Sequence, residues 1–111
     1  MVFERLPVFD EFTVIDQLDG DRELLFEILG LHRETIQDCL ALLLEMTPEH
    51  PSFHEIASRI ADTAERIHAT RLAELAQLLI CRGPDIELPR SARARLIRET
   101  ERFLRETSSL I

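Results

Sequence analysis

Apolar residues recur three and four positions apart along most of this chain, the spacing that places side chains on one face of an α-helix. Only three glycines and five prolines occur among the 111 residues, so few positions interrupt the pattern. No segment alternates apolar and polar residues in the way that a half-buried strand does. The sequence therefore predicts an all-α protein.

Turn and capping residues divide this pattern into helices. A short helix is expected after Pro7, and Asp21 is placed to cap a second helix that ends near Met46. Ser52 lies three residues before Glu55, which is the spacing of a capping box. A third helix is therefore predicted to begin at this point.

The third predicted helix is the longest. It is expected to run to about Cys81, which is about 29 residues or about 43 Å, and Gly83 and Pro84 end it. Pro89 then opens a fourth helix. Four helices with short connections predict an antiparallel up-down four-helix bundle, and the chain length suits a single domain over residues 1–111.

Charge is distributed unevenly in this acidic chain of net charge −8. Residues 1–55 contain thirteen acidic residues and three arginines, whereas residues 56–111 contain eight acidic residues and ten arginines. There is no lysine. Nucleic-acid binding needs a basic surface that displaces counterions, so a nucleic acid is not the expected partner. Such an uneven distribution of charge is better suited to recognition by another protein.

We expect a cytoplasmic protein that does not bind membranes. The N-terminus lacks a basic start followed by an unbroken apolar stretch, so it does not resemble a signal peptide. No apolar run approaches the roughly 20 residues that a membrane span requires. Cys39 and Cys81 fall at distant points of the predicted bundle, so no disulfide is expected between them.

On a helical projection of the third predicted helix, the apolar side chains share one side and Ser58 lies on the other. His54, Asp62, Glu65 and Ala69 flank Ser58 in this projection. The strip is therefore expected to face solvent.

Residues 57–83, ASRIADTAERIHATRLAELAQLLICRG, resemble the third helix of histidine phosphotransfer (HPt) domains, which are four-helix bundles. In that family the helix carries the pattern H-x-L-K-G, then a hydrophobic-glycine pair, then an L-x-x-x-a repeat. Residues 20–29, GDRELLFEIL, resemble the start of the family's second helix, and the similarity covers about residues 16–104. The matching positions of the third helix are Ala57, Ile60, Ile67, Ala69, Leu72, Leu75, Ala76 and Gly83.

The sequence differs from the HPt pattern at the phosphorylated histidine and at the lysine and glycine positions that follow it. Ser58 stands where the family has its phosphorylated histidine, and Ala61 and Asp62 stand where it has lysine and glycine. His68 stands where the family has its second glycine. A serine hydroxyl without a neighbouring base is a weak nucleophile. A carboxylate at position 62 also repels a phosphoryl group, which carries a charge of about −2.

The resemblance implies a bacterial protein of two-component, or phosphorelay, signal transduction that binds without transferring phosphoryl groups. Its expected partner is a histidine kinase or the receiver domain of a response regulator, which it would recruit or inhibit. We expect no enzymatic activity, no metal and no other cofactor. The expected partner-binding face consists of His54, Ser58, Arg59, Ala61, Asp62, Glu65, Arg66 and Ala69.

Two alternatives stay open from the sequence. The protein is an active phosphotransfer protein that uses His54 or His68, or it is a diverged helical bundle that binds an unrelated protein. Arg71 falls among the apolar positions, so its guanidinium is expected to reach a carboxylate. The arginines between residues 90 and 105 are expected to form a solvated helix face.

Overall fold

The computed structural model describes residues 5–46, 51–81 and 90–110, and these residues contain helices and no strand. The all-α prediction is therefore confirmed for the described part of the chain. Its helices are α1 (Glu11–Gln17), α2 (Arg22–Glu45), α3 (Phe53–Arg66), α4 (Thr70–Ile80), α5 (Arg90–Thr107) and a short 3-10 helix (Ser108–Leu110).

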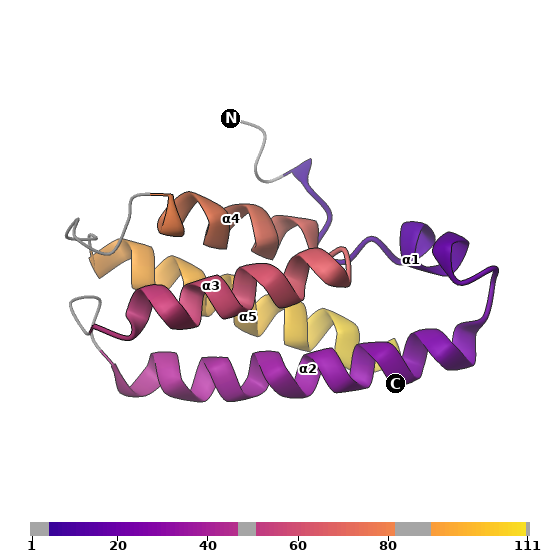
Figure 1. The fold of residues 1–111 in the computed structure, drawn as a ribbon, viewed down its shortest axis with the longest axis horizontal. Coiled ribbons are helices and arrows are strands. Elements are labelled where there is room, and N and C mark those ends of the chain that lie inside the picture. Colours follow the sequence, from indigo (N-terminus) through magenta and orange to yellow (C-terminus); the bar gives the residue numbers. More distant parts are fainter. Residues whose placement is uncertain (1–4, 47–50, 82–89, 111) are drawn as a thin grey trace.

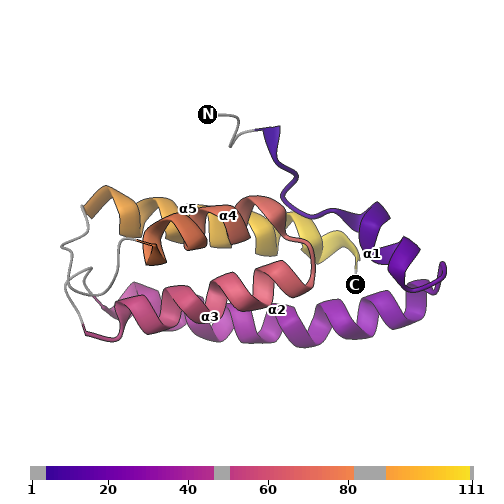
Figure 2. The same cartoon turned by 45° about the horizontal axis from the view of Figure 1, so that its top comes forward.

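Four of the helices lie alongside one another and alternate in direction. Figures 1 and 2 show α2 running one way, α3 returning, α4 reversing again and α5 returning once more, with α1 at one end of the molecule. The molecule measures 43 × 29 × 19 Å, and the 24 residues of α2 account for most of the longest dimension. The result is a compact helical bundle.

The continuous third helix predicted between residues 53 and 81 is wrong. The chain leaves α3 at Ile67, turns through His68 and starts α4 after Ala69, so α3 and α4 form an antiparallel hairpin. His68 has a φ of 56°, in the left-handed region. The Ala69 amide donates to the Ala64 carbonyl at 2.9 Å, which closes the end of α3.

Contacts from the N-terminal segment explain why the helix breaks where no glycine or proline stands. The Asp10 amide donates to the His68 carbonyl at 2.9 Å, and the Arg71 amide donates to the Pro7 carbonyl at 3.0 Å. These bonds satisfy backbone groups that a continuous helix would have paired internally. The hairpin also packs the apolar side of α4 against the bundle, where Leu72, Leu75 and Leu79 are buried.

The first helix also starts later than predicted. It begins at Glu11, after the N-cap Asp10, whose carboxylate accepts hydrogen bonds from the Thr13 amide at 3.2 Å and the Thr13 hydroxyl at 2.7 Å. Phe12 is 88% exposed although it is apolar, and Val14 is the buried residue of α1. Capping by Asp10 thus defines this helix start, and Pro7 does not.

The predicted boundaries of α2 are confirmed. The Asp21 carboxylate caps it by accepting from the Leu24 amide at 3.0 Å, and Met46 follows its last residue. α3 begins at Phe53, but the Ser52 side chain makes no hydrogen bond to the first turn, so the predicted capping box is not formed. The predicted breakers Gly83, Pro84 and Pro89 lie outside the described residues.

The core runs between all four long helices. Its largest fully buried apolar side chains include Leu29 and Ile36 of α2, Ile60 of α3, Leu72 of α4 and Phe103 of α5. Each such side chain contributes roughly 1.5–3 kcal/mol through burial. None of the described helices is long and apolar enough to cross a lipid bilayer.

Two arginines join α2 to α5 through backbone carbonyls. Arg93 donates to the Met46 carbonyl at 2.7 Å and the Leu43 carbonyl at 3.2 Å, at the end of α2. Arg33 donates to the Leu104 carbonyl at 2.8 Å and also to the Thr107 hydroxyl at 2.9 Å, near the end of α5. The arginines of α5 are therefore not all part of a solvated face, because Arg93 holds the end of its neighbour.

Candidate functional site

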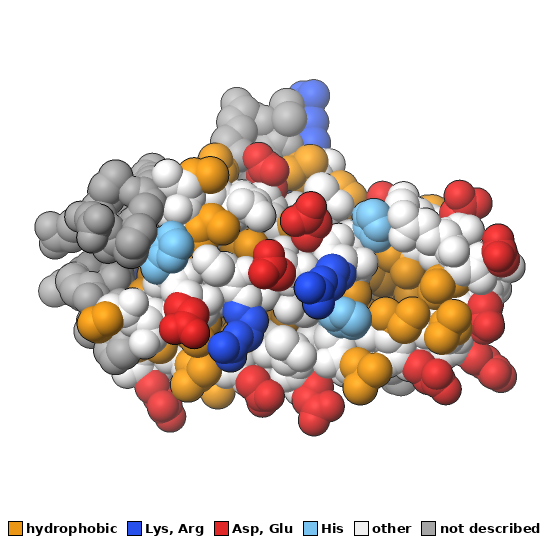
Figure 3. Space-filling model, in the orientation of Figure 1, with side chains coloured by type: hydrophobic (Ala, Val, Ile, Leu, Met, Phe, Trp, Pro, Cys, Tyr) orange, Lys and Arg blue, Asp and Glu red, His pale blue; other side chains and the backbone are white. Residues whose placement is uncertain are grey.

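Half of the predicted partner-binding residues are exposed on the outer side of α3. They are Arg59, Asp62, Glu65 and Arg66, and we call them the α3 charged face. Figure 3 shows acidic and basic side chains alternating across the front of the molecule, where α3 and α4 lie.

No ion pair joins two of the four residues of the α3 charged face. Arg59 Nη2 lies 3.9 Å from Glu55 Oε1 one turn away, a long and exposed contact that adds little stability. Among the described residues, Asp62, Glu65 and Arg66 make no ion pair. These three charges are thus open to a binding partner.

Ala61 and Ala69 do not belong to an exposed face, which corrects the sequence prediction. Both are 0% exposed. Ala61 is buried because α3 packs against both α2 and α4, so a wider arc of its surface is covered than a continuous helix would bury. Ala69 lies in the turn between α3 and α4 and precedes the first residue of α4.

Ser58, which the resemblance to HPt domains would place at the phosphorylated histidine, is half-buried. Its hydroxyl makes no hydrogen bond with a described residue, so no histidine or carboxylate of the described part of the chain is hydrogen-bonded to it. A hydroxyl is activated for attack by such a base or by a metal. The described residues around Ser58 do not provide the base.

His54 is half-buried rather than fully solvated. Its Nε2 lies 3.2 Å from the carbonyl oxygen of Ile80, the last residue of α4. Because a carbonyl oxygen can only accept, the ring nitrogen is the donor in this contact. His54 therefore joins the start of α3 to the end of α4.

His68 is placed by the turn between α3 and α4. Its Nε2 lies 3.1 Å from Gln17 Oε1, and its carbonyl accepts from the Asp10 amide. The pKa of Asp10 is lowered chiefly by the hydrogen bonds from the Thr13 hydroxyl and amide, with a smaller contribution from the positive charge of His68. His68 thus links the hairpin to α1.

No group of three or more histidine, cysteine, aspartate or glutamate side chains in the described part of the chain could hold a metal ion. Cys39 is buried and Cys81 exposed, and both are free thiols. Burial raises the pKa of Cys39, which keeps that thiol protonated near neutral pH.

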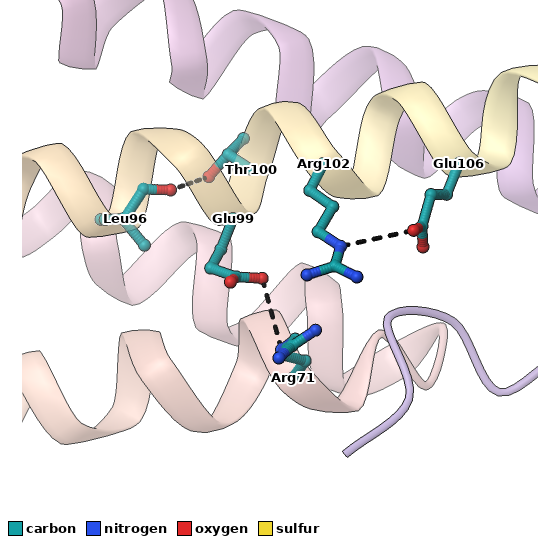
Figure 4. Close-up of polar contacts among 6 residues, drawn as sticks. All are labelled: Arg71, Leu96, Glu99, Thr100, Arg102 and Glu106. Atoms are coloured by element: carbon teal, nitrogen blue, oxygen red, sulfur yellow. Dashed lines mark hydrogen bonds and ion pairs between the residues drawn. The ribbon is translucent and has the colours of Figure 1, made fainter. Parts of the chain in front are cut away.

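Arg71 has the carboxylate partner that the sequence predicted. Its side chain is 7% exposed, and its Nε lies 3.6 Å from Oε2 of Glu99, whose side chain is 15% exposed. Figure 4 shows the two side chains meeting between α4 and α5. Both residues also line a pocket together with four arginines of α5. The sequence prediction placed those four arginines on a solvated helix face. The spacing of the arginines along α5 could be read from the sequence, but the contribution of Arg71 from α4 to the pocket could not.

No protein-family model, curated protein or solved structure matches this chain.

Proposed function

We propose that this protein is a docking module of two-component signalling with an HPt-like four-helix bundle. In this proposal α2 to α5 correspond to the bundle, and α1 is an addition. The α3 charged face binds a histidine kinase or a receiver domain, and the protein recruits or inhibits that partner without accepting a phosphoryl group.

The observation that carries the proposal is the backbone conformation of His68. Its φ of 56° lies in the region that glycine adopts most readily. The HPt pattern has glycine at this position, directly after a hydrophobic residue, and this chain has Ile67 there. A turn with glycine geometry at the glycine position of the pattern supports a shared backbone, even though the glycine itself is absent.

The chemistry at the histidine position favours binding over transfer. The Ser58 hydroxyl has no base among the described residues, and Ala61 provides no positive charge. Asp62 is exposed nearby and adds a negative charge. An incoming phosphoryl group, with a charge of about −2, would be repelled rather than held.

A matched pair of charge reversals tests where the partner binds. We expect Asp62→Arg to change the affinity for the partner more than about tenfold, which is about 1.4 kcal/mol. Glu34→Arg makes the same charge change on the exposed side of α2 and should have little effect. Calorimetric titration with purified receiver domains and kinases of the same cell measures both. Equal effects of the two reversals would remove the α3 charged face as the interface.

The direction of the Asp62→Arg effect identifies the type of partner. A receiver domain presents an acidic phosphorylation pocket, so removing a carboxylate should tighten its binding. A basic kinase surface would instead bind the variant more weakly. The sign of the change therefore separates the two proposed partners.

Phosphotransfer is tested with a radiolabelled kinase or receiver. We expect no acid-labile label to accumulate on this protein. Label that disappears in His54→Ala or His68→Ala would instead support the alternative of an active phosphotransfer protein.

A further inference from the structure

Arginine side chains from two helices line one pocket between α4 and α5. The pocket has a volume of about 630 Å³, within the range of about 300–1,000 Å³ that is typical of small-molecule sites. The arginines that line it are Arg71, Arg95, Arg98, Arg102 and Arg105. Five guanidinium groups around one pocket are an unusual concentration of positive charge in a chain of net charge −8.

Helical spacing creates most of this concentration. Arg95, Arg98, Arg102 and Arg105 follow one another at intervals of three and four residues on α5, so they form one stripe about 15 Å long. Arg71 reaches the stripe from α4 because the hairpin places α4 beside α5. The pocket therefore exists only in the folded hairpin.

Two ion pairs with acidic side chains are formed at the pocket by described residues. Glu99 pairs with Arg71 at 3.6 Å, and Glu106 pairs with Arg102 at 3.3 Å, as Figure 4 shows. Arg98 and Arg105 are exposed, and their side chains make no ion pair with a described residue. Like charges held close together repel one another unless an anion lies between them.

The lining also limits the kind of anion. Among the described residues, its lining consists of the five arginines with Glu99 and Glu101, so no aromatic or aliphatic side chain is present to hold a base or an acyl chain. Guanidinium groups bind phosphate oxygens in pairs, with a planar geometry that lysine lacks. A long polyanion such as a nucleic acid would meet the acidic remainder of the molecule. A compact anion with several phosphate groups fits best.

We propose that the α4–α5 pocket binds a compact anion that carries two or more phosphate groups. Free polyphosphate and the headgroup of a phosphoinositide share this chemistry. The proposal goes beyond the docking function and does not depend on the α3 charged face.

The test compares two double variants of the full chain that remove the same charge. Arg98→Gln with Arg105→Gln alters the pocket, whereas Arg59→Gln with Arg66→Gln alters the α3 charged face. Circular dichroism and urea unfolding establish that both variants fold. Binding of tripolyphosphate is measured by calorimetry, and binding of vesicles that contain phosphatidylinositol 4,5-bisphosphate by co-sedimentation.

We expect the pocket variant to bind at least about tenfold more weakly and the control variant to lose about twofold or less. Glu101→Gln should tighten binding, because it removes a carboxylate from the lining. Binding of tripolyphosphate identifies a free anion, and binding of vesicles alone identifies the headgroup. Equal losses in both double variants, or no binding of either probe by the unaltered protein, would overturn the proposal. Either result leaves the docking proposal untouched, because that proposal is tested with Asp62→Arg.

Discussion

At the scale of single residues, His68 determines the path of the chain. A residue other than glycine in the left-handed region costs about 1 kcal/mol. Hydrogen bonds offset part of this cost, because the imidazole contacts Gln17 and the His68 carbonyl accepts from Asp10. The strain and the contacts that oppose it are thus located in the same turn.

Substitutions of His68 should separate the strain from the side-chain contact. Both His68→Gly and His68→Ala remove the hydrogen bond to Gln17, but only glycine also removes the strain of the left-handed backbone conformation. We expect His68→Gly to be more stable than His68→Ala by about 1 kcal/mol. Urea unfolding of the two variants at neutral pH gives the difference. A His68→Ala variant that is equally stable or more stable would show that the turn is not strained.

At the scale of helices, small side chains allow α3 and α4 to pack closely. Ala57, Ala61 and Ala64 of α3 and Ala76 of α4 are at most 1% exposed. Side-chain size sets the distance between packed helices, so alanines permit a close approach. The loss of exposure at Ala61 follows from this packing.

The buried environment of Ala61 makes a clear prediction. We expect Ala61→Lys to destabilise the protein by about 2 kcal/mol or more, because a long charged side chain must enter a packed interface. Asp62→Lys, at the exposed neighbouring position, should change stability by about 0.5 kcal/mol or less. Thermal and urea unfolding measure both changes. Similar stabilities of the two variants would contradict the buried position of Ala61.

At the scale of the whole molecule, contacts distant in sequence hold α4 and the N-terminal segment to α5. Arg71 pairs with Glu99, and its amide donates to the Pro7 carbonyl. Phe9 contacts Phe103 of α5 edge to face, with ring centroids 6.4 Å apart. The hairpin is therefore braced both by the helix beside it and by the segment that precedes α1.

Breaking the buried pair should cost much more than breaking an exposed one. Glu99→Ala leaves the Arg71 guanidinium without this carboxylate, and we expect a loss of about 3 kcal/mol. The double variant Arg71→Met with Glu99→Leu should recover most of that loss, because apolar side chains can replace the pair. Glu106→Ala breaks the exposed pair with Arg102 and should cost less than about 1 kcal/mol. Urea titration gives the free energy of unfolding of each variant. Equal losses for Glu99→Ala and Glu106→Ala would contradict the prediction.

Local sequence signals predicted the features that depend on neighbouring residues. Helical periodicity predicted the helical content, and Asp21 predicted the start of α2, because a cap bonds to an amide three residues away. In α5, Leu96, Ile97 and Phe103 share one side of the helix and are buried, in keeping with the apolar periodicity of the sequence. Each of these signals acts within one or two helical turns, so the sequence alone was sufficient.

The hairpin was decided by tertiary structure. Residues 67–69 contain no glycine or proline, so a continuous helix and a hairpin share the same local pattern there. Bonds from the distant Pro7 and Asp10 and the burial of α4 favour the hairpin. This reversal buried Ala61 and Ala69 and brought Arg71 beside the arginines of α5. The sequence alone determined which side chains each helix carries. Packing between helices determined which of those side chains meet, because the free energy that stabilises the packed helices comes from contacts between residues distant along the chain.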